Sequence, residues 1–422
     1  MTLALHGRAP VVSRELTPFR AIGEAERLAA DRVLRSGRLS SYLGAAGPGF
    51  MGGEEVRAFE SAAAELFGVR HALGVNSWTS GLVACVGAIG LEPGDEIITS
   101  PWTMAATATS VLQWAGIPVF ADIDPVTYNI DPRSVEERIS PRTRAILAVD
   151  IFGLSADVEA LRAIADRHGL LLIGDTAQAP GARAGDGFAG TRYDIGGFSL
   201  NYHKHIHCGE GGIVVTDDDR LAERVALIRN HAEVVTTSED PAELNGLLGY
   251  NFRMGEIEAA IAREQLGRLA ERVADRQRVA RTLDEGLAGI AGIRTPEIPD
   301  GHTHAYYVYG MQLDLDAWGC SRERVLEALR AEGVEGLFAG YQTLHRLPLF
   351  RHRVAYGTGG FPWTAGDREV PYGDGVCPVA ERLHDETFLG FNMCMYALPE
   401  DELAQVVEAF RVTWDHRDAL AG

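Results

Sequence analysis

The stretch "FSLNYHKHIHCGEGG", residues 198–212, gathers three histidines, one cysteine and one lysine ahead of a glycine-rich turn. Side chains of these types could bind a metal ion, hold a phosphate, or supply an amine that attacks a carbonyl group. A count distinguishes the amine from the other groups. The chain has 422 residues, of which 39 are Lys or Arg, and Lys204 is the single lysine among them.

Lys204 offers a chemistry that arginine cannot perform. An arginine guanidinium stays protonated in proteins, whereas a lysine amine can lose its proton, attack a carbonyl and form a Schiff base. Lys204 also lies just past a predicted strand end, where ligands collect in parallel sheets. Chance survival of one lysine on an exposed loop would explain the count but not this position. The sequence therefore favours a Schiff-base lysine.

The sequence gives less support to a metal site or a phosphate loop in this stretch. His203, His205 and His207 would share one face of a strand, but their spacing matches no common zinc pattern. We therefore expect no metal, and we expect these histidines to line a pocket, to form loop hydrogen bonds, or to contact another subunit. "GEGG" (209–212) lacks the Lys-Ser/Thr of a P-loop, and "GPGFMG" (47–52) matches G-x-G-x-x-G without a preceding strand.

Charge and cysteine content exclude several classes of protein. A formal net charge of −20 leaves no basic excess for binding nucleic acid or an anionic membrane. The five cysteines are odd in number and widely spaced, which favours a reducing compartment over a disulfide framework. The N-terminus has no signal-peptide pattern, and the apolar window 103–121 is broken by Gly-Ile-Pro. We therefore expect a cytoplasmic protein.

Helical and strand patterns alternate strictly from about residue 53 to residue 216. This alternation, with continuous apolar strands, predicts an α/β fold with a mostly parallel central sheet and helices on both faces. We predict a large α/β domain over 1–255, including an N-terminal helical segment, and a smaller α+β domain over 256–422. A single long helix is expected from about residue 255, and residues 340–395 are expected to form loops over a pocket.

Three polar clusters fall at predicted strand ends, and together they fit pyridoxal phosphate (PLP). This cofactor needs an acid partner for its pyridine nitrogen, and Asp175 ends the strand 170–175. Its phosphate needs a helix N-terminus, and "NSWTSGL" supplies Ser77, Thr79 and free N–H groups there. A strand-end cap and an ordinary helix cap would explain each group separately. Their combination with Lys204 predicts a PLP site.

Five motifs in this order resemble the DegT/DnrJ/StrS family of PLP-dependent sugar aminotransferases, a branch of the fold-type I aminotransferases. The resemblance runs from about residue 20 to residue 290 and continues weakly to the end. The motifs are the segment 90–132, "DTAQAPGA" (175–182), "DIGGFSLNYHKHIHCGEGGIVVTDD" (194–218), "RNHA" (229–232) and "LGYNFRMGEIEAAIAREQL" (248–266).

The resemblance implies a role for each matching residue. Lys204 would form the Schiff base and shuttle the proton, Asp175 would pair with the pyridinium nitrogen, and Gln178 would contact the ring hydroxyl. Asn251 would reach the phosphate of a neighbouring subunit, making a homodimer with shared active sites. The implied phosphate ligands are Ser77, Thr79 and Ser199.

Two positions depart from the family pattern within the expected cofactor site. The family often has glycine where Trp78 stands, and an aromatic residue that stacks on the ring where Met104 stands. Trp102 is an alternative stacking residue, so we place Trp78, Trp102 and Met104 together in the site. The segment 388–403 is also unlike the family's usual ending, which leaves the sugar open.

By this resemblance, the chain transfers an amino group from an amino acid, L-glutamate, to a keto-sugar linked to a nucleotide, in amino-sugar biosynthesis. Three alternatives stay open. A cyclitol could replace the sugar. Similar dehydratases act on keto-deoxysugars but carry histidine in place of the lysine, and the position five after Ser199 holds Lys204. A regulator that binds PLP without catalysis could also retain the fold.

Overall fold

Strands from the first half of the chain form a seven-stranded sheet, as the alternating pattern predicts. The structure, a computed structural model, describes residues 2–420. Met1, at the start of the predicted first domain, and residues 421–422, at the end of the predicted second domain, lie outside the described residues. Every neighbouring pair of strands is parallel except at β9, which runs antiparallel to β1 and to β8. The strand order is β1 (His71–Val75), β9 (Gly212–Thr216), β8 (Ile195–Ser199), β5 (Leu171–Asp175), β4 (Thr143–Val149), β2 (Glu96–Thr99) and β3 (Ile117–Phe120).

Both faces of this sheet are buried, which explains why its strands are continuous apolar runs. Along β4, Ala145 and Leu147 pack on the side of α3 and α7, whereas Ile146 and Ala148 pack on the side of α5 and α6. Because successive side chains of a strand point to opposite faces of the sheet, β4 contributes alternate residues to the hydrophobic clusters on its two sides. The helices of this half are α1 (Glu24–Ser36), α2 (Glu54–Phe67), α3 (Trp78–Ile89), α4 (Ala105–Leu112), α5 (Pro132–Arg138), α6 (Val158–His168), α7 (Asp219–Arg229) and α8 (Pro241–Leu244), and a small hairpin pairs β6 (Arg183–Ala184) with β7 (Gly187–Phe188).

The helix predicted from residue 255 is two helices. α9 (Glu256–Leu266) packs on α1 and α2, and α10 (Leu269–Leu287) packs on α15. The break falls at Gly267 and Arg268, where a glycine lowers the helical propensity. The predicted domain boundary at residue 255 lies at the start of α9, while the change of hydrophobic core occurs along α10, whose buried side chains join the second core. The division at 255 stays a prediction.

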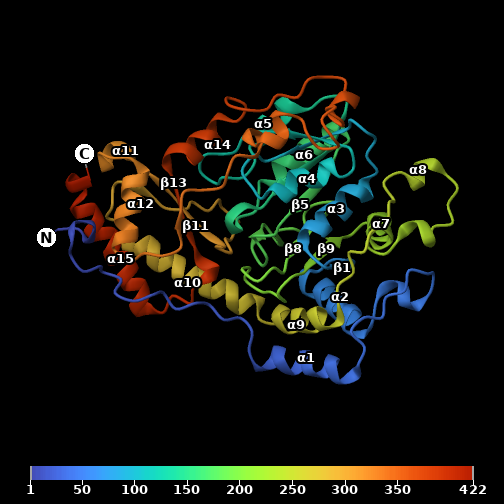
Figure 1. The fold of residues 1–422 in the computed structure, drawn as a ribbon, viewed down its shortest axis with the longest axis horizontal. Helices are drawn as coiled ribbons and strands as arrows, with labels where there is room; N and C mark the ends of the chain where they lie inside the picture. Colours follow the sequence, from blue (N-terminus) through green and yellow to red (C-terminus); the bar gives the residue numbers. More distant parts are fainter. Residues whose placement is uncertain (1, 421–422) are drawn as a thin grey trace.

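A second, antiparallel sheet lies at the other end of the molecule, to the left in Figure 1. Its core also takes Leu3, Val12 and Leu16 from the N-terminal segment, and both chain ends lie beside it. This packing of residues 3–16 differs from the predicted boundaries, which assign them to the large domain. The sheet order is β10 (Ile293–Arg294), β11 (Val308–Leu313), β13 (Phe388–Asn392) and β12 (Leu337–Phe338), with α11 (Leu315–Trp318), α12 (Arg322–Ala331) and α15 (Glu400–Asp415) around it.

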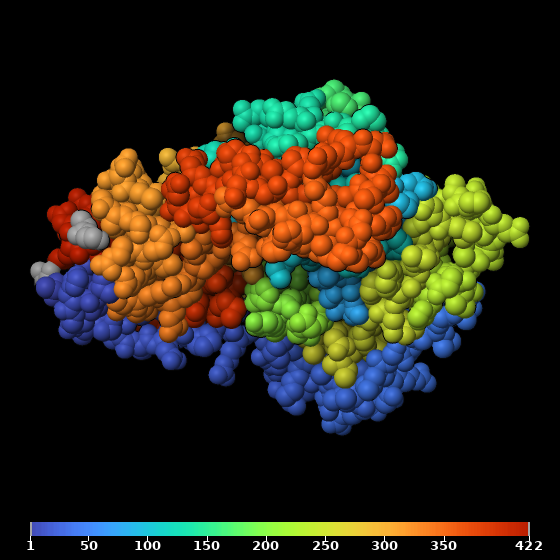
Figure 2. Space-filling view, turned by 45° about the horizontal axis from the view of Figure 1, so that its top comes forward, coloured from blue at the N-terminus to red at the C-terminus, as the bar shows by residue number. Residues whose placement is uncertain are grey.

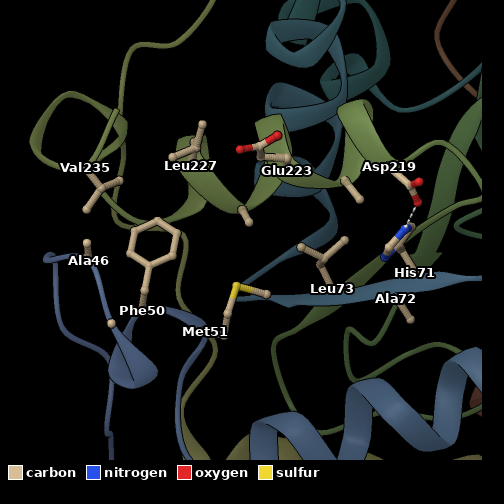
Figure 3. A pocket seen from close by; sticks show the side chains of 13 residues that line it. Ala46, Phe50, Met51, His71, Ala72, Leu73, Asp219, Glu223, Leu227 and Val235 are labelled. Carbon is tan, nitrogen blue, oxygen red and sulfur yellow. Dashed lines mark hydrogen bonds and ion pairs between the residues drawn. The ribbon is translucent and has the colours of Figure 1, made fainter. Parts of the chain in front are cut away.

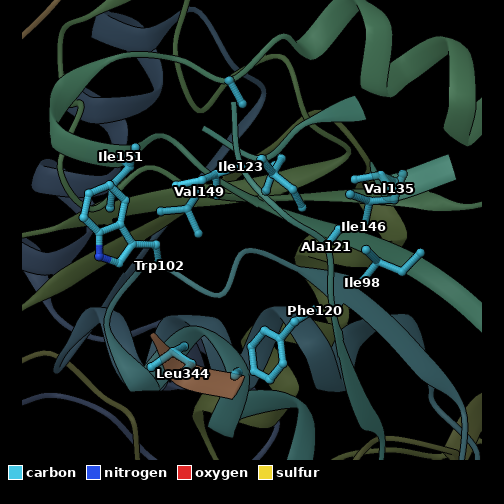
Figure 4. Close-up of a cluster of buried hydrophobic side chains, with 14 of the residues drawn as sticks. Ile98, Trp102, Phe120, Ala121, Ile123, Val135, Ile146, Val149, Ile151 and Leu344 are labelled. Atoms are coloured by element: carbon cyan, nitrogen blue, oxygen red, sulfur yellow. The ribbon is translucent and has the colours of Figure 1, made fainter. Parts of the chain in front are cut away.

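Residues 344–382 cover the edge strand β3 of the first sheet. Phe350, Trp363 and Tyr372 join its core, and the Tyr372 hydroxyl donates to the Pro118 carbonyl at 2.7 Å. Figure 2 shows this segment in orange and red-orange over that part of the molecule, and Figure 4 shows Leu344 near Phe120. An edge strand that is covered in this way cannot pair with another chain. Buried side chains of the region expected to form loops over a pocket therefore anchor it to the core, and the region includes α13 (Pro348–Arg351) and α14 (Pro378–Arg382).

The apolar window at 103–121 contains α4 and β3, as the sequence predicts. Across residues 2–420, every helix is too short or too polar to cross a membrane.

Candidate active site

The carboxyl ends of β1, β5 and β8 meet around a cavity of about 190 Å³, at the edge where ligands bind in such sheets. Helix α3 begins at this edge, directly after β1. The predicted site residues that line the cavity are Ser77, Trp78, Thr79, Met104, Asp175, Gln178, Ser199 and Lys204. The structure therefore brings eight of the ten predicted site residues around one cavity, and Trp102 and Asn251 lie outside its wall.

Lys204 is a buried amine in this cavity, with 7% of the residue exposed. Its Nζ lies 4.1 Å from the centre of the Tyr307 ring. Burial lowers the pKa of Lys204 to about 8, although the nearby Asp175 acts in the opposite direction. At pH 7.5 this pKa leaves roughly a quarter of the amines neutral, against about one in a thousand for an ordinary lysine. The side chain is therefore prepared to act as a nucleophile and a base.

Asp175 is held by two neutral donors from different helices. The Trp78 indole N–H donates to its Oδ1 at 2.7 Å, and the Thr107 hydroxyl donates to its Oδ2 at 2.7 Å. The residue is 4% exposed and ends β5, so its carboxylate projects at the carboxyl edge of the sheet. Such a carboxylate can pair with a cationic ring nitrogen.

The start of α3 provides the anion end of the site. Ser77 caps the helix, since its Oγ accepts from the Ser80 N–H at 3.1 Å, and Thr79 follows within the first turn. Ser199, at the end of β8, lines the same cavity, and its Oγ accepts from the Asn201 N–H at 3.3 Å. A helix N-terminus with hydroxyl groups beside it favours a phosphate. Capping and anion binding are compatible roles for this turn.

A chain of polar contacts lines the opposite wall. The Phe152 N–H donates to Gln178 Oε1 at 2.8 Å, so Gln178 Nε2 faces the Tyr341 hydroxyl at 3.1 Å. The Tyr307 hydroxyl lies 2.8 Å from His203 Nδ1, and burial lowers the pKa of His203 to about 4. His203 is therefore a neutral lining residue. Tyr307 directly precedes β11 of the second sheet, and sequence spacing gave no signal for it or for Tyr341.

Trp102 does not line the cavity, contrary to expectation. It is fully buried, within the hydrophobic cluster of Figure 4. Its ring packs edge-on against Phe388 and Phe152, with ring centres 4.7 Å and 5.6 Å away. Its indole N–H donates to the Tyr341 carbonyl at 2.7 Å. Packing against the second sheet removes Trp102 from the cofactor site, whereas Met104 is 64% exposed and lines the cavity.

The other two histidines of the opening stretch face away from the site. His205 is buried, and its Nε2 contacts the Ala305 carbonyl at 2.8 Å, while His207 lies half-buried beside Gln265. Burial lowers the pKa of both imidazoles. Within residues 2–420, the structure brings no three His, Cys, Asp or Glu side chains into an arrangement that could hold a metal ion.

A larger cavity of about 520 Å³ lies at the β1 edge of the sheet, between the 46–51 loop and α7. Figure 3 shows its mainly apolar wall, with the His71–Asp219 pair at one end. It lacks the buried amine and carboxylate of the first cavity. Next to the adjoining "GPGFMG" loop, the Glu256 carboxylate accepts from the Gly53 and Glu55 N–H groups, so the start of α2 already has an anionic partner from the chain itself.

Comparison with known proteins agrees with this geometry. Residues 40–369 match the DegT/DnrJ/EryC1/StrS aminotransferase family. The chain is 37% identical over 370 residues to L-glutamine:2-deoxy-scyllo-inosose aminotransferase of Streptoalloteichus tenebrarius (84% of this chain, 85% of the relative). It is 33% identical to UDP-N-acetyl-3-dehydro-alpha-D-glucosamine 3-aminotransferase of Acidithiobacillus ferrooxidans (86% and 90%). A solved structure of DesI with its TDP-sugar product shares 30% identity and a TM-score of 0.81 (99% and 98%).

The residues present fit PLP. A buried amine, a carboxylate and a helix N-terminus with hydroxyl groups face one cavity, which is the donor set this cofactor requires. The fold is that of the fold-type I aminotransferases, with a mostly parallel sheet beside a smaller sheet. The chain belongs to the DegT/DnrJ/EryC1/StrS family and is a PLP-dependent aminotransferase.

Proposed function

We propose that the enzyme moves an amino group from L-glutamate to a keto-sugar linked to a nucleotide, in amino-sugar biosynthesis. The buried amine of Lys204 beside Asp175 carries the transamination part of this proposal. Relatives that act on UDP-linked and TDP-linked sugars by name support the acceptor. All five cysteines are free, which supports a reducing, cytoplasmic compartment.

Each group of the site has a part in the reaction. Bound PLP supplies an electron sink for the carbanion formed at the donor's α-carbon. Lys204 would hold the cofactor through its aldehyde carbon until the donor's amine displaces it, and the freed, neutral Nζ would then carry the proton from the donor's α-carbon. Asp175 holds a proton on the pyridine nitrogen, and the start of α3 with Ser199 holds the phosphate. The fixed contacts of Asp175 keep it aligned during both half-reactions.

The test separates donor from acceptor. Purified enzyme loaded with PLP is mixed with L-glutamate or L-glutamine, and the loss of the cofactor's absorption is recorded. UDP- and TDP-linked keto-sugars and 2-deoxy-scyllo-inosose are then added in turn. We expect L-glutamate to remove the absorption and a nucleotide-linked keto-sugar to restore it. Restoration by the cyclitol alone would overturn the sugar assignment, and no response to either donor would overturn the transamination.

The composition of the cavity supports a dimer with shared sites. Lys204 is the one cationic side chain on the cavity wall formed by the described residues, whereas amino-acid donors and nucleotide sugars are anionic. Asn251 is exposed and does not line the Lys204 cavity of its own chain. Its backbone carbonyl accepts from Asn76 Nδ2 at 3.4 Å. Neighbouring segments expose large apolar side chains, namely Leu43, Val234 and Leu248, each more than 60% exposed. We infer that a second copy covers this surface and brings Asn251 to the phosphate.

Mixing two defective variants tests the shared site. Lys204→Ala lacks the amine but retains Asn251, and Asn251→Ala lacks the amide but retains Lys204. In a mixed dimer, one site would contain both residues. We expect the mixture to recover roughly a quarter of wild-type activity, since half of the dimers are mixed and each has one complete site. Asn251→Ala mixed with the double variant is the control, and equal activity in both mixtures would contradict sharing.

A further inference from the structure

Trp78 is almost completely buried, although it lies in the turn proposed to bind the phosphate, where a backbone N–H group alone would suffice. It is the first residue of α3, directly after the Ser77 cap, yet only 5% of it is exposed. Its side chain lies in the hydrophobic cluster between α3 and the sheet. The indole is therefore part of the floor of the cavity, and its orientation is fixed by packing.

Two glycines make room for the indole of Trp78. A Cβ added at Gly81 on α3 would lie 2.6 Å from the indole, and one at Gly197 on β8 would lie 2.4 Å from it. Gly197 also lies against the Ile213 carbonyl, so that position has no space for a side chain on either account. Both distances to the indole are shorter than a side chain tolerates, so the slot between α3 and β8 admits the Trp78 ring because Gly81 and Gly197 have no side chain.

The slot aims the one polar group of the indole at Asp175. The N–H is a donor only, and it lies 2.7 Å from Asp175 Oδ1. Thr107 occupies the other oxygen, also at 2.7 Å. The Ala177 N–H makes a longer contact to Oδ1, at 3.3 Å. A carboxylate has about four acceptor positions, so these three contacts can persist while a fourth donor approaches from the cavity. The two side-chain donors from two helices define the plane in which that fourth donor is accepted.

We propose that Trp78 is a positioning residue, which fixes the plane of the Asp175 carboxylate through its indole N–H and disperses part of its negative charge. The proposal rests on the assigned role of Asp175 at the pyridine nitrogen of PLP. Trp78 itself need not touch the reacting atoms. A glycine at this position could not donate this hydrogen bond, and Gly81 and Gly197 leave the space that the indole needs to make it.

The first experiment tests the contact without cofactor. The apoenzyme is labelled with ¹⁵N at its six tryptophans, and Trp78→Phe and Trp114→Phe assign two indole resonances. Trp114 is the matched control, because its buried N–H donates at 2.7 Å to the Val83 carbonyl, away from Asp175. We expect Asp175→Asn to move the Trp78 resonance and to leave that of Trp114 unchanged. An unmoved Trp78 resonance would overturn the proposal.

The second experiment tests the effect on the bound cofactor. Trp78→Phe keeps a ring in the slot and removes the donor, so more negative charge remains on Asp175. The protonated form of bound PLP is then favoured. We expect the pH midpoint of the PLP absorption change to rise by about half a unit to one unit, and kcat to fall about tenfold at an unchanged KM for the donor. Trp114→Phe should alter only thermal stability.

The outcomes separate this proposal from the proposed function. A wild-type enzyme that binds PLP but responds to no amino donor would refute the function, while the absorption midpoint and the indole resonance would still test Trp78. An unchanged midpoint in Trp78→Phe would overturn the positioning role. If Trp78→Phe does not fold, the Trp78 resonance is assigned by exclusion, from Trp→Phe variants of the other five tryptophans, and its shift in Asp175→Asn decides the question.

Discussion

Replacing Lys204 with arginine is expected to abolish transamination as completely as replacing it with alanine. Arginine retains the positive charge and much of the length, but it cannot release its proton to become a nucleophile or a base. Loss of a positioned proton carrier lowers kcat by about 10³-fold or more. The measurement is single-turnover loss of PLP absorption on mixing with L-glutamate.

Small amines provide the control for this result. Ethylamine added to Lys204→Ala can occupy the space of the missing side chain and carry the proton, so partial recovery is expected. The same amine should not rescue Lys204→Arg, because the guanidinium fills the space. Near-normal activity of either variant would show that another group performs the proton transfer. Loss of activity in Lys204→Arg would also explain why the chain has a single lysine, since arginine occupies the other 38 of its 39 Lys and Arg positions.

The sequence could predict the cluster of site residues because parallel strands end at one edge. Asp175 and Ser199 end neighbouring strands, and Ser77 follows a third, so strand ends recognised in the sequence become neighbours in space. Helix ends were also predictable, since Gly68 and Gly90 terminate their helices with positive φ values of 68° and 75°. These features depend on local patterns that a single chain segment carries.

Other parts of the site depend on contacts between distant segments. Trp102 belongs to the core because Phe388, from the second sheet, packs on its ring. Tyr307 reaches Lys204 from the residue that directly precedes β11. Residues 344–382 pack against the β3 edge through aromatic side chains that, in sequence, suggest loops over a pocket. None of these placements follows from periodicity or spacing, because each is decided by how the second sheet docks on the first.

Replacing Asp175 with asparagine should give the other large loss, with the fold retained. Asparagine has nearly the same shape, but it is neutral and cannot balance a protonated pyridine nitrogen. Its amide can accept one of the two donors, Trp78 or Thr107, and its NH₂ group must face the other. Removing a preorganised stabilising group of this kind lowers kcat by about 10² to 10³-fold.

Two further measurements assign the Asp175 loss to charge. Asp175→Glu retains the carboxylate and displaces it by one methylene, so its kcat should lie between those of the wild type and Asp175→Asn. Bound PLP is quantified in each variant, because the phosphate contacts proposed for α3 and Ser199 do not involve this carboxylate and should retain the cofactor. A variant that binds PLP yet turns over at the wild-type rate would show that Asp175 is only a strand-end cap. A variant with normal PLP content and a slow donor half-reaction would place the loss at the electron sink itself.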